Sequence, residues 1–180
     1  MTGAPSDTDL MKRIAAGEAL AFRQLASRHL NRAHAIAMRV VHNREDAEEA
    51  VQDALSRVWQ HASRFEPERS AFSTWFYRIL ANAALDRLRR RPPSSEAIDV
   101  HEDSLADSSA TPEETWTKAG EANRVQAAIA TLPPNQRLAV ALCYYEDFTQ
   151  PDAARIMNIH LKALEALLFR AKTTLKRSLT

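Results

Sequence analysis

The chain has few of the residues on which several large classes of protein depend. Among its 180 residues there are only one cysteine and three glycines. The single cysteine, Cys143, cannot form a disulfide within the chain, and it lies in an apolar run where a small buried side chain is expected. Three glycines are too few for the loops that cradle nucleotide phosphates, and no G-x-x-x-x-G-K pattern occurs.

Long apolar stretches are also missing. No segment approaches the roughly eighteen consecutive apolar residues that mark a membrane span. The first nine residues lack the apolar core of a signal peptide. We therefore expect a cytoplasmic protein with no direct membrane insertion.

Helical patterning and segregated charge are what the sequence does have. Apolar residues recur at helical spacing and strand-type alternation is absent, which predicts an all-α fold. The net charge is +1, but residues 1–91 carry fifteen Lys and Arg against eleven Asp and Glu, and residues 122–180 carry eight against four. Residues 92–121 carry one basic residue against eight acidic ones. This pattern suggests that each basic region meets a polyanion and that the acidic region does not.

Prolines mark the boundaries between these regions. Pro92 and Pro93 follow three arginines and end the first helical block, because proline cannot continue a helix. The following residues, to about Pro112, are rich in Ser, Asp, Glu and Pro and too poor in apolar side chains to bury a core. We therefore predict two small helical domains, residues 1–91 and 121–180, joined by a flexible acidic linker over residues 92–120.

Apolar periodicity places helices in both domains. In the first we expect helices over about 7–15, 19–41 and 45–62 and a fourth from residue 73. In the second we expect them over about 121–131, 135–146, 150–157 and 161–178. The core faces of the helices over 19–41 and 45–62 should include Phe22, Leu25, Leu30, Val51, Leu55 and Trp59.

Residues 72–91 are the most informative stretch. They begin with aromatic side chains, continue as an apolar-periodic helix and end in a block of arginines. Steps of four, three and four place on one helical stripe Trp75, Ile79, Asn82 and Asp86. Rings, an amide and a cationic end on one helix suit the opening and gripping of a DNA strand. Taken alone, the stretch is equally consistent with an amphipathic core helix whose basic end is solvated.

Three motifs follow one another along the chain. The pattern D-A-E-D-x-x-Q-(E/D)-x-(F/L)-x-x-x-W is matched by Asp46, Ala47, Glu48, Gln52, Asp53, Leu55 and Trp59. The pattern F-x-T-W-(L/F)-Y-R-I-A-x-N-x-x-x-D-x-x-R-R is matched by Phe72, Thr74, Trp75, Tyr77, Arg78, Ile79, Asn82, Asp86, Arg89 and Arg90. The pattern L-P-x-x-Q-R is matched by Leu132, Pro133, Gln136 and Arg137. In this order and spacing the chain resembles the extracytoplasmic-function sigma factors of bacterial RNA polymerase over nearly its whole length.

The resemblance implies a two-domain, all-α sigma factor that binds core RNA polymerase and directs promoter-specific transcription initiation. The N-terminal domain would recognise the minus-10 element and the C-terminal domain the minus-35 element. Because the polymerase makes the bonds, no catalytic residue, cofactor or metal is expected. The implied partners are the core polymerase, promoter DNA and an anti-sigma factor, which members of the family usually have.

In that family the helix near residues 45–62 docks on a basic coiled coil in the clamp of the polymerase's largest subunit. The resemblance therefore implies a docking surface made by Glu49, Gln52 and Asp53. Asp46 and Glu48 are better interpreted as capping residues. A simpler alternative is that these acids only complement the dipole at the start of the helix.

The loop over residues 64–72 captures, in the resembling family, a base flipped from the non-template strand of the minus-10 element. An extruded base needs an aromatic wall and polar groups at its edge. The minus-10 candidates are Arg64, Phe65, Phe72, Trp75, Arg78, Asn82, Asp86, Arg87, Arg89 and Arg90. The arginines would hold the backbone, and Asn82 would contact a base edge or phosphate. The three rings suit the protein core better than a stacking role.

Residues 149–172 form a helix-turn-helix candidate. Thr149 is the expected N-cap with Asp152 at the third position, and Asn158 stands at the turn, where asparagine tolerates the left-handed conformation. The second helix of such a motif enters the major groove. The minus-35 candidates are Lys162, Glu165, Arg170 and Lys172. Glu165 replaces a common lysine of the family, but a carboxylate can accept from cytosine N4, so Glu165 does not exclude DNA binding. Because the helix departs from the family pattern here, no familiar minus-35 sequence is transferred to this chain.

Two other functions fit the sequence less well. A stand-alone helix-turn-helix regulator would explain residues 149–172 but not the motif at 46–59. A nucleic-acid-processing enzyme is disfavoured because the sequence has no H-x-E…C-x-x-C site, phosphate loop or nucleophile elbow. The sequence leaves open the promoters, the inducing signal and whether the free protein is open or self-masked.

Overall fold

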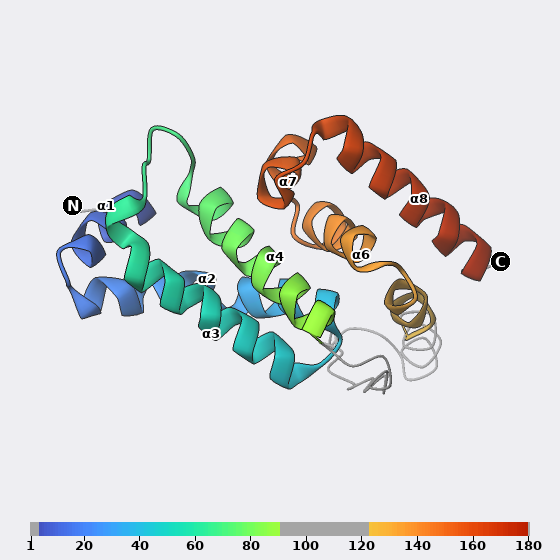
Figure 1. Cartoon of the computed structure of the whole chain (residues 1–180), viewed down its shortest axis with the longest axis horizontal. Helices are drawn as coiled ribbons and strands as arrows, with labels where there is room; N and C mark the ends of the chain where they lie inside the picture. The colour runs from blue at the N-terminus through green and yellow to red at the C-terminus, as the bar shows by residue number, and fades with distance from the viewer. Residues whose placement is uncertain (1–3, 91–122, 180) are drawn as a thin grey trace, which may run out of the picture.

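A computed structural model describes residues 4–90 and 123–179, and these residues form helices with no strand among them. Arg91 and the predicted linker over residues 92–120 lie outside the described residues. Residues 4–90, the N-terminal lobe, contain α1 (Asp7–Ala15), α2 (Ala19–Val41), α3 (Arg44–His61), the 3-10 turn η1 (Ala62–Arg64) and α4 (Phe72–Arg90). Residues 123–179, the C-terminal lobe, contain a helical segment over 123–130, α6 (Pro134–Val140), the π-helical segment η2 (Ala141–Tyr145), α7 (Gln150–Met157) and α8 (Leu161–Leu179). The predicted all-α fold is confirmed (Figure 1).

Side-chain caps explain several of the helix ends. At α1 the Ser6 hydroxyl accepts from the Asp9 backbone N–H at 3.1 Å, and the Asp9 carboxylate accepts from the Ser6 N–H at 3.2 Å. At α3 the Asn43 side chain accepts from the Asp46 N–H at 2.9 Å. Between α2 and α3, His42 has a left-handed backbone with φ of 51°, so only two residues separate the helices. This tight joint sets α2 against α3.

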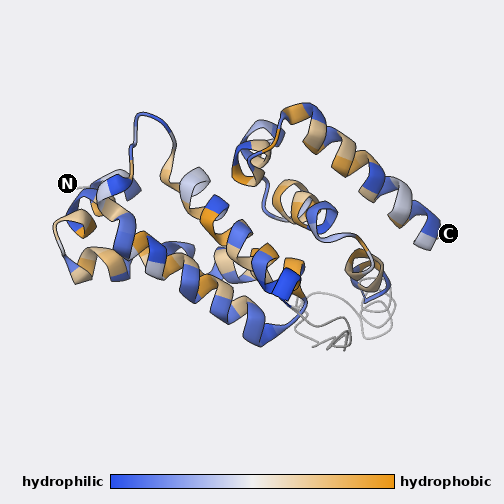
Figure 2. Cartoon of the chain, in the orientation of Figure 1, coloured by the Kyte–Doolittle hydropathy of each residue, from blue (hydrophilic) through white to orange (hydrophobic). Residues whose placement is uncertain are grey.

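The core of the N-terminal lobe is built around α4. Phe76, Tyr77 and Leu80 are almost fully buried and pack with α2 and α3. The buried Tyr77 hydroxyl lies 3.1 Å from His29 Nδ1, and burial raises the pKa of Tyr77 to about 12. Polar side chains gather in the loop between η1 and α4, which Figure 2 shows in hydrophilic colours. The lobe therefore holds α4 rigidly and leaves the loop before it exposed.

Two side chains expected in the core are exposed. Leu30 is 45% exposed and Trp59 is 42% exposed, and Leu55 is only partly buried. The prediction was wrong for Leu30 and Trp59 because the apolar faces of α2 and α3 are wider than the area their partners cover. Helical periodicity shows which side chains share a face but not how much of that face is covered.

The C-terminal lobe has an aliphatic core, with Leu138, Leu142, Ile156 and Leu164 fully or almost fully buried. The helix predicted over 135–146 changes at residue 141 to the π-helical segment η2, whose end is marked by a 3.1 Å hydrogen bond from the Glu146 N–H to the Ala141 carbonyl. Cys143 is half-buried, and burial raises the pKa of its thiol.

The two lobes pack against each other. α6 and α7 contact α2 and α4, and α8 lies on the outer side of the C-terminal lobe (Figure 1). The hydrophobic core runs without interruption from one lobe into the other. The structure therefore has the closed arrangement, one of the two that the sequence left open.

Candidate polymerase and DNA interfaces

The three predicted docking residues share the outer face of α3. Glu49 and Asp53 are four residues apart and half-exposed, and Gln52 is exposed beside them. Both carboxylates pair with Arg87 of α4, and the Arg87 Nη2 to Asp53 Oδ2 distance is 2.8 Å. Arg87, a minus-10 candidate, thus joins α4 to the acidic face of α3. Among the capping candidates, Glu48 pairs instead with Arg44 at 2.8 Å.

An apolar groove lies next to these residues, between α2 and α3. It has a volume of about 460 Å³ and is lined by Phe22, Leu30, His34, Glu48, Val51, Gln52, Leu55 and Ser56. The exposed Trp59 ring packs edge-on against Phe22 with a centroid distance of 5.4 Å. Exposed apolar patches of this kind mark interaction sites. Sequence analysis missed the groove because its apolar lining residues were expected in the core.

A second pocket lies in the loop before α4. It has a volume of about 320 Å³ and is lined by Arg64, Phe65, Glu66, Arg69, Ser70, Trp75 and Arg78. The rings of Phe65 and Trp75 lie 5.5 Å apart and are tilted by 50°. Four of the minus-10 candidates, Arg64, Phe65, Trp75 and Arg78, therefore meet at one pocket with partly exposed rings and cationic side chains.

The other minus-10 candidates lie elsewhere. Phe72 is only 4% exposed and stacks on Phe76 at 5.6 Å, so its ring belongs to the core behind the pocket. Asn82 is exposed one helical turn beyond Arg78. Asp86 accepts from Arg89 at 2.8 Å, and Arg90 is exposed at the end of α4. The candidates thus form a pocket, a core ring and a polar surface that continues along α4.

The helix-turn-helix has the predicted local geometry. The Thr149 hydroxyl accepts from the Asp152 N–H at 3.3 Å and donates to the Asp152 carboxylate at 2.7 Å. Asn158 ends α7 in the left-handed conformation, with φ of 54°, as expected. On α8, Leu164 and Leu168 are buried, whereas the exposed side includes Lys162, Glu165, Phe169, Arg170 and Lys172. α8 therefore offers all four minus-35 candidates to solvent.

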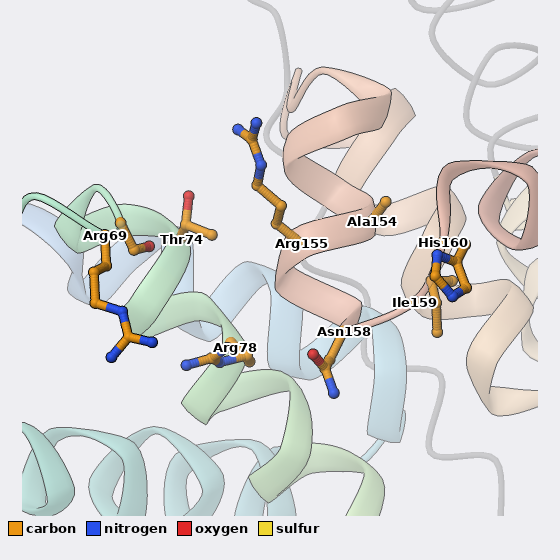
Figure 3. Close-up of a pocket in the computed structure, with 9 residues that line it drawn as sticks. Arg69, Thr74, Arg78, Ala154, Arg155, Asn158, Ile159 and His160 are labelled. Atoms are coloured by element: carbon orange, nitrogen blue, oxygen red, sulfur yellow. The ribbon is translucent and has the colours of Figure 1, made fainter.

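A third cleft lies between the lobes, with a volume of about 440 Å³ (Figure 3). The N-terminal lobe contributes Arg69, Ser70, Thr74 and Arg78, and the C-terminal lobe contributes Ala154, Arg155, Asn158, Ile159 and His160. In the close-up the Asn158 side chain points toward Arg78. Arg69, Ser70 and Arg78 also line the loop pocket, so the cleft and the pocket adjoin. Sequence analysis missed this cleft because it depends on how the lobes pack.

Two further observations concern the described residues only. None of their helices is long and apolar enough to cross a membrane. Within 4–90 and 123–179, no three His, Cys, Asp or Glu side chains come together in a way that would hold a metal ion.

Both lobes match families of known proteins. Residues 25–92 match the family model of Sigma-70 region 2, and residues 122–175 match that of Sigma-70, region 4. The ECF RNA polymerase sigma factor SigM of Mycobacterium tuberculosis is 34% identical over 176 residues, covering 97% of this chain and 85% of SigM. The ECF RNA polymerase sigma factor SigW of Bacillus subtilis is 25% identical over 178 residues, covering 94% of each chain.

Solved structures show the same helical fold. CnrH, in complex with the cytosolic domain of CnrY, matches with a TM-score of 0.68 at 26% identity over 95% of both chains. The sigma factor RpoE, in complex with the anti-sigma factor NepR from Bartonella quintana, matches with a TM-score of 0.65 at 23% identity. That match covers 88% of this chain and 96% of RpoE.

The chain therefore belongs to the ECF RNA polymerase sigma factors, the family that its three motifs indicated. It binds core RNA polymerase and directs promoter-specific transcription initiation. A stand-alone helix-turn-helix regulator would not need a domain that matches Sigma-70 region 2.

Proposed function

We propose that the outer face of α3 is the surface that holds core polymerase, through Glu49, Gln52 and Asp53. The observation that carries this assignment is that Gln52 lines the apolar groove between α2 and α3, while the half-exposed Glu49 and Asp53 lie on the same face of α3. A basic coiled coil would meet carboxylates on one side and apolar side chains on the other. Interfaces with an apolar centre and a polar rim are of this kind.

Charge reversal tests this assignment, and Arg87 provides its control. Glu49→Lys combined with Asp53→Lys should reduce co-purification with core polymerase at least about tenfold, because a close interfacial charge pair can be worth roughly 1.5 kcal/mol or more. The same variant also removes the ion pairs to Arg87. Arg87→Ala removes those pairs while leaving both acids, so it should keep polymerase binding. Equal loss in both variants would mean that the acids serve only to hold α4.

We assign minus-10 recognition to the loop pocket and to α4. Phe65 and Trp75 would form the wall for an extruded base, and Arg64 and Arg78 would hold its phosphates. Asn82 would read an edge one turn along α4, with Asp86, Arg89 and Arg90 beyond it. Phe72 would support the pocket from the core, and Arg87 would set the position of α4. The supporting observation is that the partly exposed rings and the arginines line one pocket.

Minus-35 recognition is assigned to the exposed side of α8. Lys162, Arg170 and Lys172 would contact phosphates, and Glu165 would accept from a base edge. The domain limits proposed are 1–91, 92–120 and 121–180. The chain would supply no chemistry of its own and would act in the cytoplasm, where the polymerase works. An anti-sigma factor is a further proposed partner, supported by the complex in which the similar sigma factor RpoE was solved.

A further inference from the structure

A row of hydrogen-bonded side chains joins α1 to α2 and α4. The Asp7 carboxylate, in the first turn of α1, accepts from Arg28 Nη1 at 2.9 Å and lies 2.8 Å from His29 Nε2. The other ring nitrogen, His29 Nδ1, lies 3.1 Å from the hydroxyl of Tyr77 on α4. Because an ionised carboxylate can only accept, we assign a proton to His29 Nε2, which donates to Asp7. We name Asp7, His29 and Tyr77 the His29 relay.

The relay is largely shielded from water. The His29 side chain is 15% exposed, and its ring packs edge-on against Phe72, Phe76 and Tyr77 with centroid distances of 5.1, 5.7 and 5.9 Å. A hydrogen bond to a charged group is stronger in such surroundings, and its loss is more costly, than in water. Bonds at both ring nitrogens and packing against three rings therefore hold His29 in one orientation.

The relay reaches the loop pocket through Phe72, the first residue of α4. Phe72 contacts His29, and its ring also lies 6.0 Å from Phe65 and 6.2 Å from Trp75, the two rings that line the pocket. His29 thus contacts α4 at Phe72 and at Tyr77, which are more than one helical turn apart. Two contacts on one helix fix its rotation as well as its position, so the orientation of His29 sets the start of α4 and the ring behind the pocket.

α1 also borders the other end of the pocket loop. It packs against η1, and Figure 1 shows the loop rising beside α1. Because η1 ends at Arg64 and α4 begins at Phe72, α1 meets the chain on both sides of the loop, by packing at η1 and through the relay at α4. The buried Leu10, Met11 and Ile14 fix α1 itself on the core. Asp7 is therefore held on a rigid element from which it can position His29.

We infer that Asp7 is a positioning residue for minus-10 recognition, which acts through His29 and Phe72 on the aromatic wall of the loop pocket. Without the Asp7 carboxylate, the His29 Nε2–H group loses its partner in surroundings with little water, and the ring must turn to regain one. The rings that pack against it shift in turn. This inference places a minus-10 determinant in α1, outside the residues 25–92 that match Sigma-70 region 2. Its functional part rests on the proposed function of the loop pocket.

Three variants of α1 separate the relay from general support by the helix. Asp7→Ala removes the acceptor, Asp7→Asn keeps an oxygen that can accept from His29, and Asp9→Ala removes an exposed acid that caps the same helix. In a full-length chain that carries Trp59→Phe and Trp116→Phe, the emission comes from Trp75 alone. Asp7→Ala should raise the acrylamide quenching constant of this emission, because the ring loses its packing, whereas Asp7→Asn and Asp9→Ala should leave the constant unchanged. Equal quenching in all four proteins, or an equal rise in either of the other two variants, would overturn the relay.

Promoter opening tests the functional part. The reconstituted holoenzyme is used with a promoter mapped by transcription, and 2-aminopurine in the non-template strand of its minus-10 element reports the unstacking of bases. Asp7→Ala should form about fivefold less open complex than the wild type with unchanged binding to core polymerase, and Asp7→Asn and Asp9→Ala should stay within about twofold, since couplings between separate sites begin near a factor of five.

Trp75→Ala tests the pocket itself and should also lose opening, because it removes one of the two rings of the wall. Normal opening with Asp7→Ala beside a loss with Trp75→Ala would overturn the positioning role of Asp7. Normal opening with Trp75→Ala would instead overturn the proposed function of the loop pocket, and the functional part of the inference with it.

Discussion

The two lobes differ in where they place their aromatic rings. In the N-terminal lobe Phe72, Phe76 and Tyr77 are buried together along α4. In the C-terminal lobe the buried side chains are aliphatic, and Tyr145 and Phe148 face the arginines and Tyr77 of the other lobe. The C-terminal lobe thus folds around aliphatic side chains and uses Tyr145 and Phe148 to contact the N-terminal lobe.

The lobes also differ in how they hold their candidate functional charges. On α3 and α4, Glu49 and Asp53 pair with Arg87, and Asp86 pairs with Arg89. On α8, by contrast, Lys162, Glu165 and Lys172 make no ion pair with any other described residue. Changes to the paired charges on α3 and α4 should therefore alter stability and function together, whereas changes to the unpaired charges on α8 should alter DNA binding alone.

The largest expected effect comes from the two cores. Phe76→Ala should lower the free energy of unfolding by about 3–5 kcal/mol and Leu164→Ala by about 2–5 kcal/mol, because both side chains are fully buried. Since the core is continuous between the lobes, each variant should shift one shared thermal transition in calorimetry. A variant that melts only its own lobe, leaving the other transition in place, would show that the lobes are energetically separate.

The sequence predicted local features better than surfaces. The predicted roles of Thr149 as an N-cap and of Asn158 as a left-handed cap were correct, because both depend only on neighbouring residues. Leu30 and Trp59 were misplaced because periodicity does not reveal which part of a helix face is covered. The pairing of Arg87 with α3 could not be predicted, because it depends on how α3 and α4 cross. Arg32 and Glu146, which pair between the lobes, are 114 positions apart in the chain, and no local pattern signals their contact.

An intermediate effect should appear at the junction of the lobes as the pH falls. His42 ends α2 close to Arg137 of α6, and burial, with a contribution from that guanidinium, lowers the pKa of His42 to about 4. Below the ordinary value near 6.5 the unfolded chain therefore takes up a proton that the folded chain does not. The contribution of His42 to the free energy of unfolding is fully present above about pH 6.5 and is lost as the pH drops toward 4. We expect a loss of about 1–2 kcal/mol after allowance for the ring's partial exposure.

His42→Asn isolates this contribution, because asparagine tolerates the left-handed backbone at this position. Urea titrations at several pH values should show a smaller loss of stability between pH 6.5 and 4 in the variant than in the wild type. Parallel curves over that interval would mean that His42 titrates alike in the folded and unfolded chains.

The smallest effects separate paired from unpaired charges. Arg87→Ala should lower the free energy of unfolding by about 1 kcal/mol, because it removes two ion pairs that join α3 and α4 and are only partly shielded from water. Lys172→Ala should leave stability within about 0.5 kcal/mol, because the side chain is exposed. In DNA binding the order should reverse. Lys172→Ala should weaken binding almost uniformly across sequences and reduce the salt slope by about one, as expected for the loss of one phosphate contact. If Arg87→Ala changes the salt slope as much as Lys172→Ala does, Arg87 contacts DNA as well as α3, and the contrast between the two lobes does not hold at this residue.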